Sequence, residues 1–518
     1  MIKSTAATAP LTQRDAAILA AIVLASIAIY LPSLRNGWVF DDWQEFVQNN
    51  QIHNWSFVWN SFIHDVWWFR DPDKLPQSAY YRPLENAWFA ANALIFGMRP
   101  VAWHLAKIVL HAVVVILCFR VAQLLTGEIA TALLTAAIFA VMPAHVEAVV
   151  WASSIPEPLS TAFELGALLF LIGRKPGWSR GLIAALILYA CATLTHESAI
   201  LFPLIVAAYA FLIERRRAGE SIRLAAPFIA IAIAYLCARL YALGAEDFFG
   251  APYSQTLAAL GWAGLAPPHG ALEIVLTAPV VLLEYLGVLT VPGIAGPAHD
   301  VNWTTGVAPI TLISVGVLAG LAALASAAAW RSSHRNLYIF CAAWSLLTLA
   351  PSMKLNALNA LVQDRLLYAP SFGWSLAVAI AAVQLAAVGP RARTAVAGAT
   401  AVVLAAYAIS AMRIERYWHD NLTFYTRCVA IDPHNVDYLR LLVQLLNEKT
   451  DFTGATDALR RAVQLDPDNP YLHTRLANEY ALMQRPIDFQ AEMRKTRALW
   501  GKPRMPATGA AARAAPSP

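Results

Sequence analysis

The chain has 518 residues, of which 58% are hydrophobic and 14% are charged, and its formal net charge is +5. Soluble globular domains carry about 25% charged residues, so the composition excludes one large water-soluble core. The small net charge gives no electrostatic footprint for nucleic acid. Five cysteines, four of them inside apolar runs, do not form a disulfide framework. These properties predict an all-α, polytopic membrane protein.

Apolar runs of membrane-spanning length recur along the chain. We predict about eleven transmembrane helices near residues 15–34, 101–125, 129–143, 156–173, 180–195, 197–213, 223–243, 307–330, 336–351, 366–388 and 394–412. The first run follows Lys3 and Arg14 and resembles a signal peptide, but we interpret it as an uncleaved span. The run Leu276–Val291 contains Glu284 and is broken by Pro279, so we interpret it as a re-entrant or interfacial helix. Three crossings in this region instead of one would raise the count to thirteen.

Lysine and arginine concentrate in short loops, which predict the orientation of the chain. These loops are residues 174–180, 214–223, 331–335 and 391–393. Because basic loops stay in the cytoplasm, we place them there together with the N-terminal residues 1–14. The two long loops, 35–99 and 243–306, and the segment after residue 412 then lie outside. Most tryptophans of the first outer loop are expected as interfacial anchors, and stacking on a sugar is the alternative for any single one. We expect the bacterial inner membrane, with a periplasmic tail.

The chain changes character after residue 412. Residues 413–503 are charged and amphipathic, and Asp432-Pro433-His434-Asn435 recurs 34 residues later as Asp466-Pro467-Asp468-Asn469. That period is typical of tetratricopeptide repeats, which are stacked helix–turn–helix units. Such arrays normally need about three units, and this segment has roughly two and a half, so we expect it to pack on the membrane domain. The Ala/Pro-rich residues 504–518 are expected to be disordered.

Polar and ionisable side chains at membrane depth are costly and therefore informative. In this chain they concentrate at the predicted outer ends of the spans. The candidates are Asp41, Asp42, Arg82, His104, His111, His145, Glu147, Glu157, His196, Glu197, Arg365 and Tyr368. Carboxylates can act as general bases, and arginine offers a fixed fork for phosphate. Such a site suits a lipid phosphate donor whose head lies at the outer surface. Alternatively, each group caps a helix or pairs with a neighbour at the interface.

Other chemistries lack their motifs. The fragments His145-Val146-Glu147 and His196-Glu197 resemble parts of a metal site, but the sequence has no His-Glu-x-x-His helix. It has no Walker loop, no Gly-x-Ser-x-Gly elbow and no Gly-rich dinucleotide fingerprint. It shows no pair of corresponding halves with broken helices, as a transporter would. Two alternatives to an enzyme stay open, namely a membrane scaffold that binds partners through the repeats and a transporter of a lipid-linked substrate.

Five motifs in sequence order resemble a known family. They are Asn36-Gly37…Phe40-Asp41-Asp42, Tyr81-Arg82-Pro83-Leu84 with Trp103-His104-Leu105, His145-Val146-Glu147-Ala148-Val149-Val150-Trp151, His196-Glu197, and Arg365-Leu366-Leu367-Tyr368-Ala369-Pro370-Ser371. Together with the repeat tail, they resemble the transmembrane and tetratricopeptide-repeat (TMTC-like) family of the GT-C glycosyltransferase superfamily, which is related to the protein O-mannosyltransferases. The resemblance covers the chain from about residue 15 to about residue 500.

The resemblance implies a GT-C-like catalytic domain at residues 15–412 that moves a sugar from a polyprenyl-phosphate donor to an acceptor hydroxyl on the extracytoplasmic side. Asp41 or Asp42 would be the general base, and Arg365, Arg82 and Tyr368 would hold the donor phosphate. The other candidates, His104, His111, His145, Glu147, Glu157, His196 and Glu197, would line the pocket. The acceptor would be a protein Ser/Thr or an envelope glycan or lipid, reached through the repeats. Superfamily members differ in metal use, so a divalent cation stays open.

The chain departs from the family pattern at two places. After Trp151 the family usually shows Gly-Arg-x-Asp/Glu, whereas this chain has Ser154-Ile155-Pro156-Glu157, which keeps the acid and lacks the arginine. Where relatives have Lys-Glu, this chain has His196-Glu197, so the cation at that position depends on pH. These differences bear on the identity of the donor sugar and the acceptor more than on the class of reaction.

Overall fold

The computed structural model describes residues 11–71, 78–174, 177–248, 271–304, 306–353 and 361–500. Most of the predicted cytoplasmic segment 1–14, much of the second outer loop 243–306 and the segment 504–518 that we expect to be disordered lie outside the described residues.

The described residues form helices and no β-strand. The first part of the chain contains α1 (Gln13–Tyr30), α2 (Trp55–Asn60), α3 (Pro83–Phe96), α4 (Pro100–Thr126), α5 (Ile129–Val141), α6 (Val146–Val150), α7 (Pro156–Leu171), α8 (Arg180–Thr195), α9 (Phe202–Ala208), α10 (Ala218–Phe248), α12 (Ala271–Thr290), α13 (Pro309–Arg331), α14 (Arg335–Leu349), α15 (Pro370–Ala386) and α16 (Pro390–Glu415). The tail contains α17 (Asn421–Ile431), α18 (Val436–Glu448), α19 (Phe452–Leu465), α20 (Pro470–Leu482) and α21 (Pro486–Leu499). The prediction of an all-α chain is therefore confirmed for the described residues.

Each of the eleven predicted spans falls on helical residues, but the helices differ in length. Within the described residues, six are long and apolar enough to cross a membrane, or seven if the bent pair α5 and Pro143–Val150 counts as one span. The helices α7, α8, α14 and α15 have only 15 to 17 residues. At about 1.5 Å per residue, such helices are shorter than the ~30 Å hydrocarbon core of a bilayer unless the bilayer thins around them. The count of eleven therefore stays a prediction.

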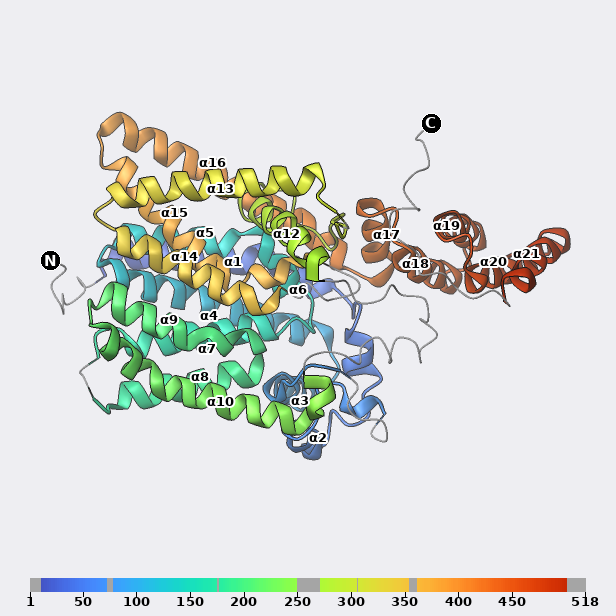
Figure 1. The fold of residues 1–518 in the computed structure, drawn as a ribbon, viewed down its shortest axis with the longest axis horizontal. Coiled ribbons are helices and arrows are strands. Elements are labelled where there is room, and N and C mark those ends of the chain that lie inside the picture. The colour runs from blue at the N-terminus through green and yellow to red at the C-terminus, as the bar shows by residue number, and fades with distance from the viewer. Residues whose placement is uncertain are drawn as a thin grey trace.

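The expectation that Pro279 breaks the run Leu276–Val291 is wrong, whereas its interpretation as a re-entrant or interfacial helix stays a prediction. Pro279 does not break α12, which is continuous from Ala271 to Thr290, and the helix passes the same length and composition test as the other long helices. A proline inside a helix removes one backbone hydrogen bond, and a helix packed against neighbours can tolerate that loss. In Figure 1, α12 runs obliquely to α13, and the Thr311 hydroxyl of α13 donates to the Leu276 carbonyl of α12 at 3.2 Å.

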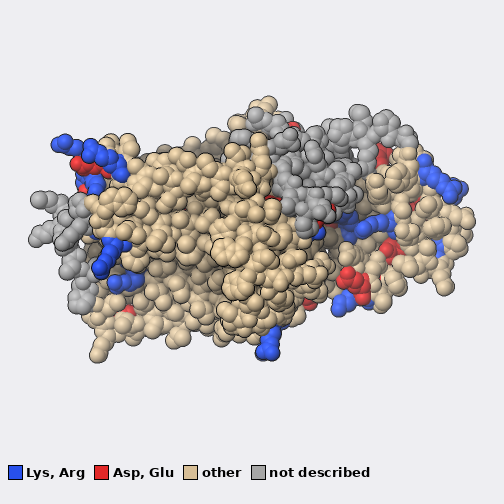
Figure 2. Space-filling model, turned by 90° about the horizontal axis from the view of Figure 1, so that it is seen from below, with Lys and Arg blue, Asp and Glu red and all other residues tan. Residues whose placement is uncertain are grey.

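The two ends of the bundle carry different parts of the chain (Figure 1). The loops that we predict to be cytoplasmic lie at the end where the described N-terminus begins, whereas α2, α3, α6 and the tail lie at the opposite end. Figure 2 shows Lys and Arg gathered at the first end, a broad band almost free of charge along the bundle, and mixed charges on the tail. A band without charge is typical of a surface that faces lipid.

The tail consists of antiparallel helices that continue the core of the bundle. One hydrophobic cluster includes buried residues of the bundle, then Trp418 and Phe424, and then Leu439 and Leu459 of the tail. The recurring Asp-Pro-x-Asn motif has the same geometry in both copies. In the first, the Asn435 side chain donates to Asp432 at 3.2 Å and accepts from the Asp437 N–H at 3.1 Å, which caps α18. The second copy repeats both contacts at the start of α20. Assignment of these helices to tetratricopeptide repeats stays a prediction.

Candidate active site

Asp42 is fastened to the turn that follows α6. Its Oδ1 accepts hydrogen bonds from the Ser153 N–H at 2.9 Å and from the Ser153 hydroxyl at 2.5 Å, and its Oδ2 accepts from the Val39 N–H at 2.9 Å. Burial raises the pKa of Asp42 to about 7, although these hydrogen bonds oppose the effect. Both carboxylate oxygens are thus engaged in joining the first outer loop to the α6–α7 turn.

Asp41 has a different environment although it is the preceding residue. Its side chain is partly exposed, and its carboxylate makes no hydrogen bond or ion pair with the described residues. Burial raises the pKa of Asp41 to about 6, against the opposing positive charges of Arg365 and Arg70. An unengaged carboxylate with a proton affinity near neutral pH has the properties of a general base. The structure thus separates the two aspartates that the sequence left equivalent.

Phe40, which precedes Asp41, has an unusual backbone. Its φ is 57°, in the left-handed region that bulky side chains rarely adopt. Such a conformation costs about 1–3 kcal/mol and persists only when its surroundings fix it. The Phe40 N–H donates to the Asn421 Oδ1 at 2.8 Å, and its ring lies 5.3 Å from the Trp151 ring and stacks at 6.0 Å on Phe424. The loop that carries the candidate base is therefore held in part by the tail.

Arg365 lies in the short helix η9 (Asp364–Leu367) and is anchored by carboxylates from two other helices. Its Nη1 contacts Glu147, its Nε lies 3.1 Å from Glu157, and its Nη2 donates to Gln363 at 2.7 Å. Burial alone would lower the pKa of Arg365, but Glu147 and Glu157 outweigh burial and raise it. A guanidinium has five N–H groups, so about two remain for a further anion.

Arg82, at the start of α3, is anchored in the same manner. Its Nε and Nη2 donate to the two carboxylate oxygens of Glu197 at 2.7 and 2.8 Å, and its Nη1 lies 3.5 Å from Glu85. The neighbouring His196 accepts a hydrogen bond at Nδ1 from the Ser198 N–H, so its Nε2 carries the proton that points towards Glu157, 3.9 Å away. A small cavity lies beside these residues, with Glu157, His196, Ser198 and Thr348 in its wall.

These residues make up one cluster, which we call the charged group. Its members are Asp41, Asp42, Arg82, Glu85, Glu147, Glu157, His196, Glu197 and Arg365. Carboxylates outnumber arginines in it. Burial raises the pKa of Glu85 to about 8, although Arg82 opposes the effect, so at neutral pH part of the negative charge is removed by protonation. The charged group offers a candidate base, Asp41, and two anchored arginines.

Three other predicted site residues form a separate cluster, the inner group of His111, His145, Tyr368 and Ser371. The His111 Nδ1 lies 2.7 Å from the Tyr368 hydroxyl, its Nε2 faces the Ala140 carbonyl at 3.4 Å, and the His145 Nε2 lies 2.7 Å from the Ser371 hydroxyl. All four side chains are buried. The structure therefore does not bring Tyr368, His111 and His145 to the charged group. His104 is likewise buried, on α4.

The polar residues near the site that the sequence analysis did not select include Glu85 of the charged group, Lys107 and His299. The Lys107 ammonium, buried in α4, donates to the carbonyls of Trp151 and Ser154, both at 2.6 Å, and so fixes the α6–α7 turn. A charge inside an apolar run was the signal that could have identified it. His299 bridges Asp364 at 2.8 Å and Glu284 at 3.0 Å. Burial would lower the pKa of His299, but the two carboxylates raise it to about 10. Glu284, His299 and Asp364 do not form a motif in the sequence, so their contact could not be predicted from it.

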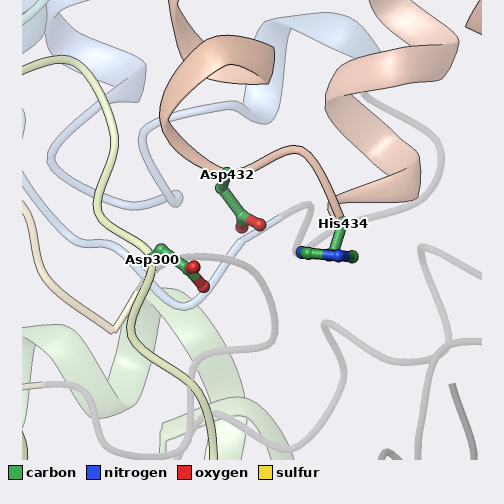
Figure 3. A group of neighbouring side chains, drawn as sticks. All are labelled: Asp300, Asp432 and His434. Carbon is green, nitrogen blue, oxygen red and sulfur yellow. The ribbon is translucent and has the colours of Figure 1, made fainter. Parts of the chain in front are cut away.

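One group of potential metal ligands occurs among the described residues, and it lies outside the charged group. Asp300, Asp432 and His434 each direct a ligand atom to within 4.8 Å of the others (Figure 3). Two carboxylates and an imidazole suit a borderline divalent cation such as Mn²⁺ or Zn²⁺. The group joins the second outer loop to the turn between α17 and α18, so its donor set fits a metal at the tail junction rather than at Asp41.

Comparisons with known proteins agree with the motifs. No protein-family model matches the chain. The chain is 23% identical to the protein O-mannosyl-transferase Tmtc3 of Drosophila melanogaster, over 94% of this chain and 59% of that protein. It is 32% identical to the protein O-mannosyl-transferase TMTC3 of Mus musculus, over 35% of this chain and 20% of that protein. These relatives confirm the resemblance inferred from the motifs, although the chain spans at most 59% of either.

A likeness to a solved structure is weaker. The crystal structure of ArnT from Cupriavidus metallidurans in the apo state is 14% identical to the chain, with a TM-score of 0.35, and the match covers 82% of this chain and 81% of that one. A likeness at this score does not assign the fold.

Proposed function

We propose that the chain is a membrane glycosyltransferase that moves a sugar from a polyprenyl-phosphate donor to an acceptor hydroxyl. The observation that carries the proposal is the carboxylate of Asp41, which has no partner among the described residues and feels the charge of the anchored Arg365. The relatives are named protein O-mannosyl-transferases, which supports transfer to a protein Ser or Thr. The other class of acceptor is an envelope glycan or lipid.

The chemistry needs a base and a stabilised leaving group. Asp41 takes the proton of the acceptor hydroxyl while the hydroxyl oxygen bonds to the anomeric carbon of the sugar. The bond from that carbon to the phosphate oxygen breaks, and its electron pair leaves with the polyprenyl phosphate. Attack from the face opposite the phosphate inverts the anomeric centre. The remaining N–H groups of Arg365, and those of Arg82, stabilise the charge that develops on the phosphate.

The position of the charged group suits a donor that is embedded in lipid. It lies at the end of the bundle that carries the tail, away from the basic loops (Figure 1). By the positive-inside rule this is the extracytoplasmic end, which in a bacterium faces the periplasm. A polyprenyl chain would remain in the bilayer while its phosphate reaches Arg365. The tail at the same end would present the acceptor.

The proposal is tested with the full chain in nanodiscs. Purified protein is incubated with a polyprenyl-phosphate mannose carrying a radiolabelled sugar and with Ser/Thr-rich acceptor peptides, and transfer is counted. We expect transfer by the natural protein and loss of transfer in Asp41→Asn. Thermal stabilisation by the unlabelled donor, measured in the natural protein and in Arg365→Lys, separates binding from chemistry.

The same measurements address the two alternatives. A scaffold would bind no polyprenyl phosphate and would still form a stable complex through its tail. A transporter of a lipid-linked substrate would move the donor across proteoliposomes at a rate that is the same in Asp41→Asn. Either result, together with no transfer to any acceptor, would overturn the proposed function.

A further inference from the structure

The geometry points to a positioning role for the first tail helix. We propose that Asn421 and Phe424 of α17 hold Phe40 in its left-handed conformation and thereby place the carboxylate of Asp41, so that docking of the tail controls the candidate base. The expected effect on sugar transfer rests on the proposed function, whereas the effect of α17 on the conformation of Phe40 does not.

Asp41 is held in place through its backbone. Its carboxylate makes no hydrogen bond or ion pair with the described residues, so its place depends on the backbone around it. On its C-terminal side, the backbone is fastened by Asp42, whose carboxylate bonds Ser153 and Val39 within the bundle and the outer loop. On its N-terminal side lies Phe40, with a φ of 57°. A bulky residue does not keep that conformation without external contacts.

Phe40 is held by two contacts from the first tail helix, α17. Its N–H donates to Asn421 Oδ1 at 2.8 Å. Its ring stacks on Phe424 at 6.0 Å, with an interplanar angle of 28°. Asn421 and Phe424 are one turn apart on α17, so a single helix end supplies both contacts.

The segment just before α17 is attached to the outer loop and to the end of α6. The carbonyl of His419, just before α17, accepts a hydrogen bond from the Gly37 N–H at 3.1 Å. The Trp418 ring stacks on Trp151 at 5.8 Å, and Trp151 in turn lies 4.9 Å from the Arg365 guanidinium. The tail therefore contacts the outer loop at Gly37 and Phe40 and the end of α6 at Trp151. A displacement of α17 would release Phe40 and let Asp41 move.

The experiment compares three tail variants of the full chain. Asn421→Ala removes the side-chain oxygen that accepts from the Phe40 N–H, and Asn421→Asp keeps an oxygen in the same place. Asp451→Ala is the control, because it removes a side-chain hydrogen-bond acceptor at the start of another tail helix, α19, away from Phe40. We expect kcat to fall about 10²-fold in Asn421→Ala with the KM for the donor within about twofold, because a misplaced reacting group lowers the rate of chemistry. Asn421→Asp restores most of the rate, and Asp451→Ala keeps it.

A substitution at Phe40 isolates the backbone conformation. Asparagine adopts the left-handed region more readily than phenylalanine does. In the Phe40→Asn background, Asn421→Ala should therefore lower kcat by less than it does in the natural protein. Equal losses in both backgrounds would contradict a role through the conformation of residue 40.

Hydrogen exchange provides a measurement that does not need activity. We expect the amides of residues 36–43 to exchange faster in Asn421→Ala than in the natural protein and in Asp451→Ala. Unchanged exchange and unchanged kcat in Asn421→Ala would overturn the inference. If the natural protein transfers no sugar while exchange follows the expected pattern, the proposed function fails and the positioning role stands.

Discussion

The charged group and the inner group are both clusters of polar side chains inside one helix bundle, yet they differ in how their hydrogen bonds are used. In the inner group, neutral rings and hydroxyls contact one another, as in the pair of His111 and Tyr368 at 2.7 Å. Among the hydrogen-bonding atoms of these four side chains, only the His145 Nδ1 lacks a partner within the described residues. In the charged group, the arginines are anchored but Asp41 is not. Buried polar groups that pair with one another stabilise a fold, whereas an unengaged carboxylate is available for chemistry.

The largest effect is expected at Asp41. Replacement by asparagine removes the base but keeps the shape, and general-base catalysis typically contributes about 10²–10⁴-fold. We therefore expect Asp41→Asn to lower kcat about 10³-fold while the apparent melting temperature stays that of the natural protein, because no hydrogen bond of the carboxylate is lost. Transfer assays and thermal unfolding in the same detergent measure both quantities. Full activity in Asp41→Asn would remove the distinction between the two groups.

Asp42→Asn serves as the matched substitution at the next residue. An amide in this position can still accept from Ser153, but its NH₂ would face the Val39 N–H, so one buried hydrogen bond is replaced by two opposed donors. Such a loss costs about 1–3 kcal/mol. We expect a lower free energy of unfolding and a smaller loss of kcat than in Asp41→Asn. If Asp42→Asn is stable and inactive, then Asp42 is the base.

The sequence predicted much of the helical architecture because apolar runs identify spans one at a time. It also selected most of the charged group, because a carboxylate or an arginine at the end of an apolar run is costly wherever its partner lies. It could not separate Asp41 from Asp42, since that difference depends on Ser153, 111 residues away. Nor could it detect the contact between Phe40 and Asn421, whose separation of 381 residues follows from how the tail folds back.

Sequence reasoning also grouped too many residues into one pocket. Tyr368 and His145 belong to motifs that resemble the family, but a motif does not reveal which way a side chain points in the bundle. The structure places both side chains in the inner group, whereas Arg365, three residues before Tyr368, reaches the charged group. In a short helical segment, neighbouring side chains point in different directions, so one motif can serve two clusters.

The pH dependence of transfer distinguishes the groups in another way. Burial raises the pKa of Asp41 to about 6, so the base loses its charge as the pH falls through that value. We expect kcat/KM to fall about tenfold per pH unit below pH 6 and to level off above it. A carboxylate with the usual value of 3.8 would keep its activity down to about pH 4. A profile that stays flat to pH 4.5 in a protein that remains folded would contradict the assignment of the base.

The smallest effect is expected in the inner group. Tyr368→Phe removes the hydroxyl that faces His111 Nδ1 and leaves a buried ring nitrogen without its partner, which costs about 1–2 kcal/mol of stability. The nearby Tyr30 offers a matched control, because its buried hydroxyl has no partner among the described residues, so Tyr30→Phe should be neutral or slightly stabilising. We expect donor affinity and kcat within about twofold of the natural protein in both variants. A tenfold or greater loss of donor binding in Tyr368→Phe would instead support the role in phosphate binding that the family resemblance implied. In that case Tyr368 would belong to the donor site, and the inner group would contact the donor through it.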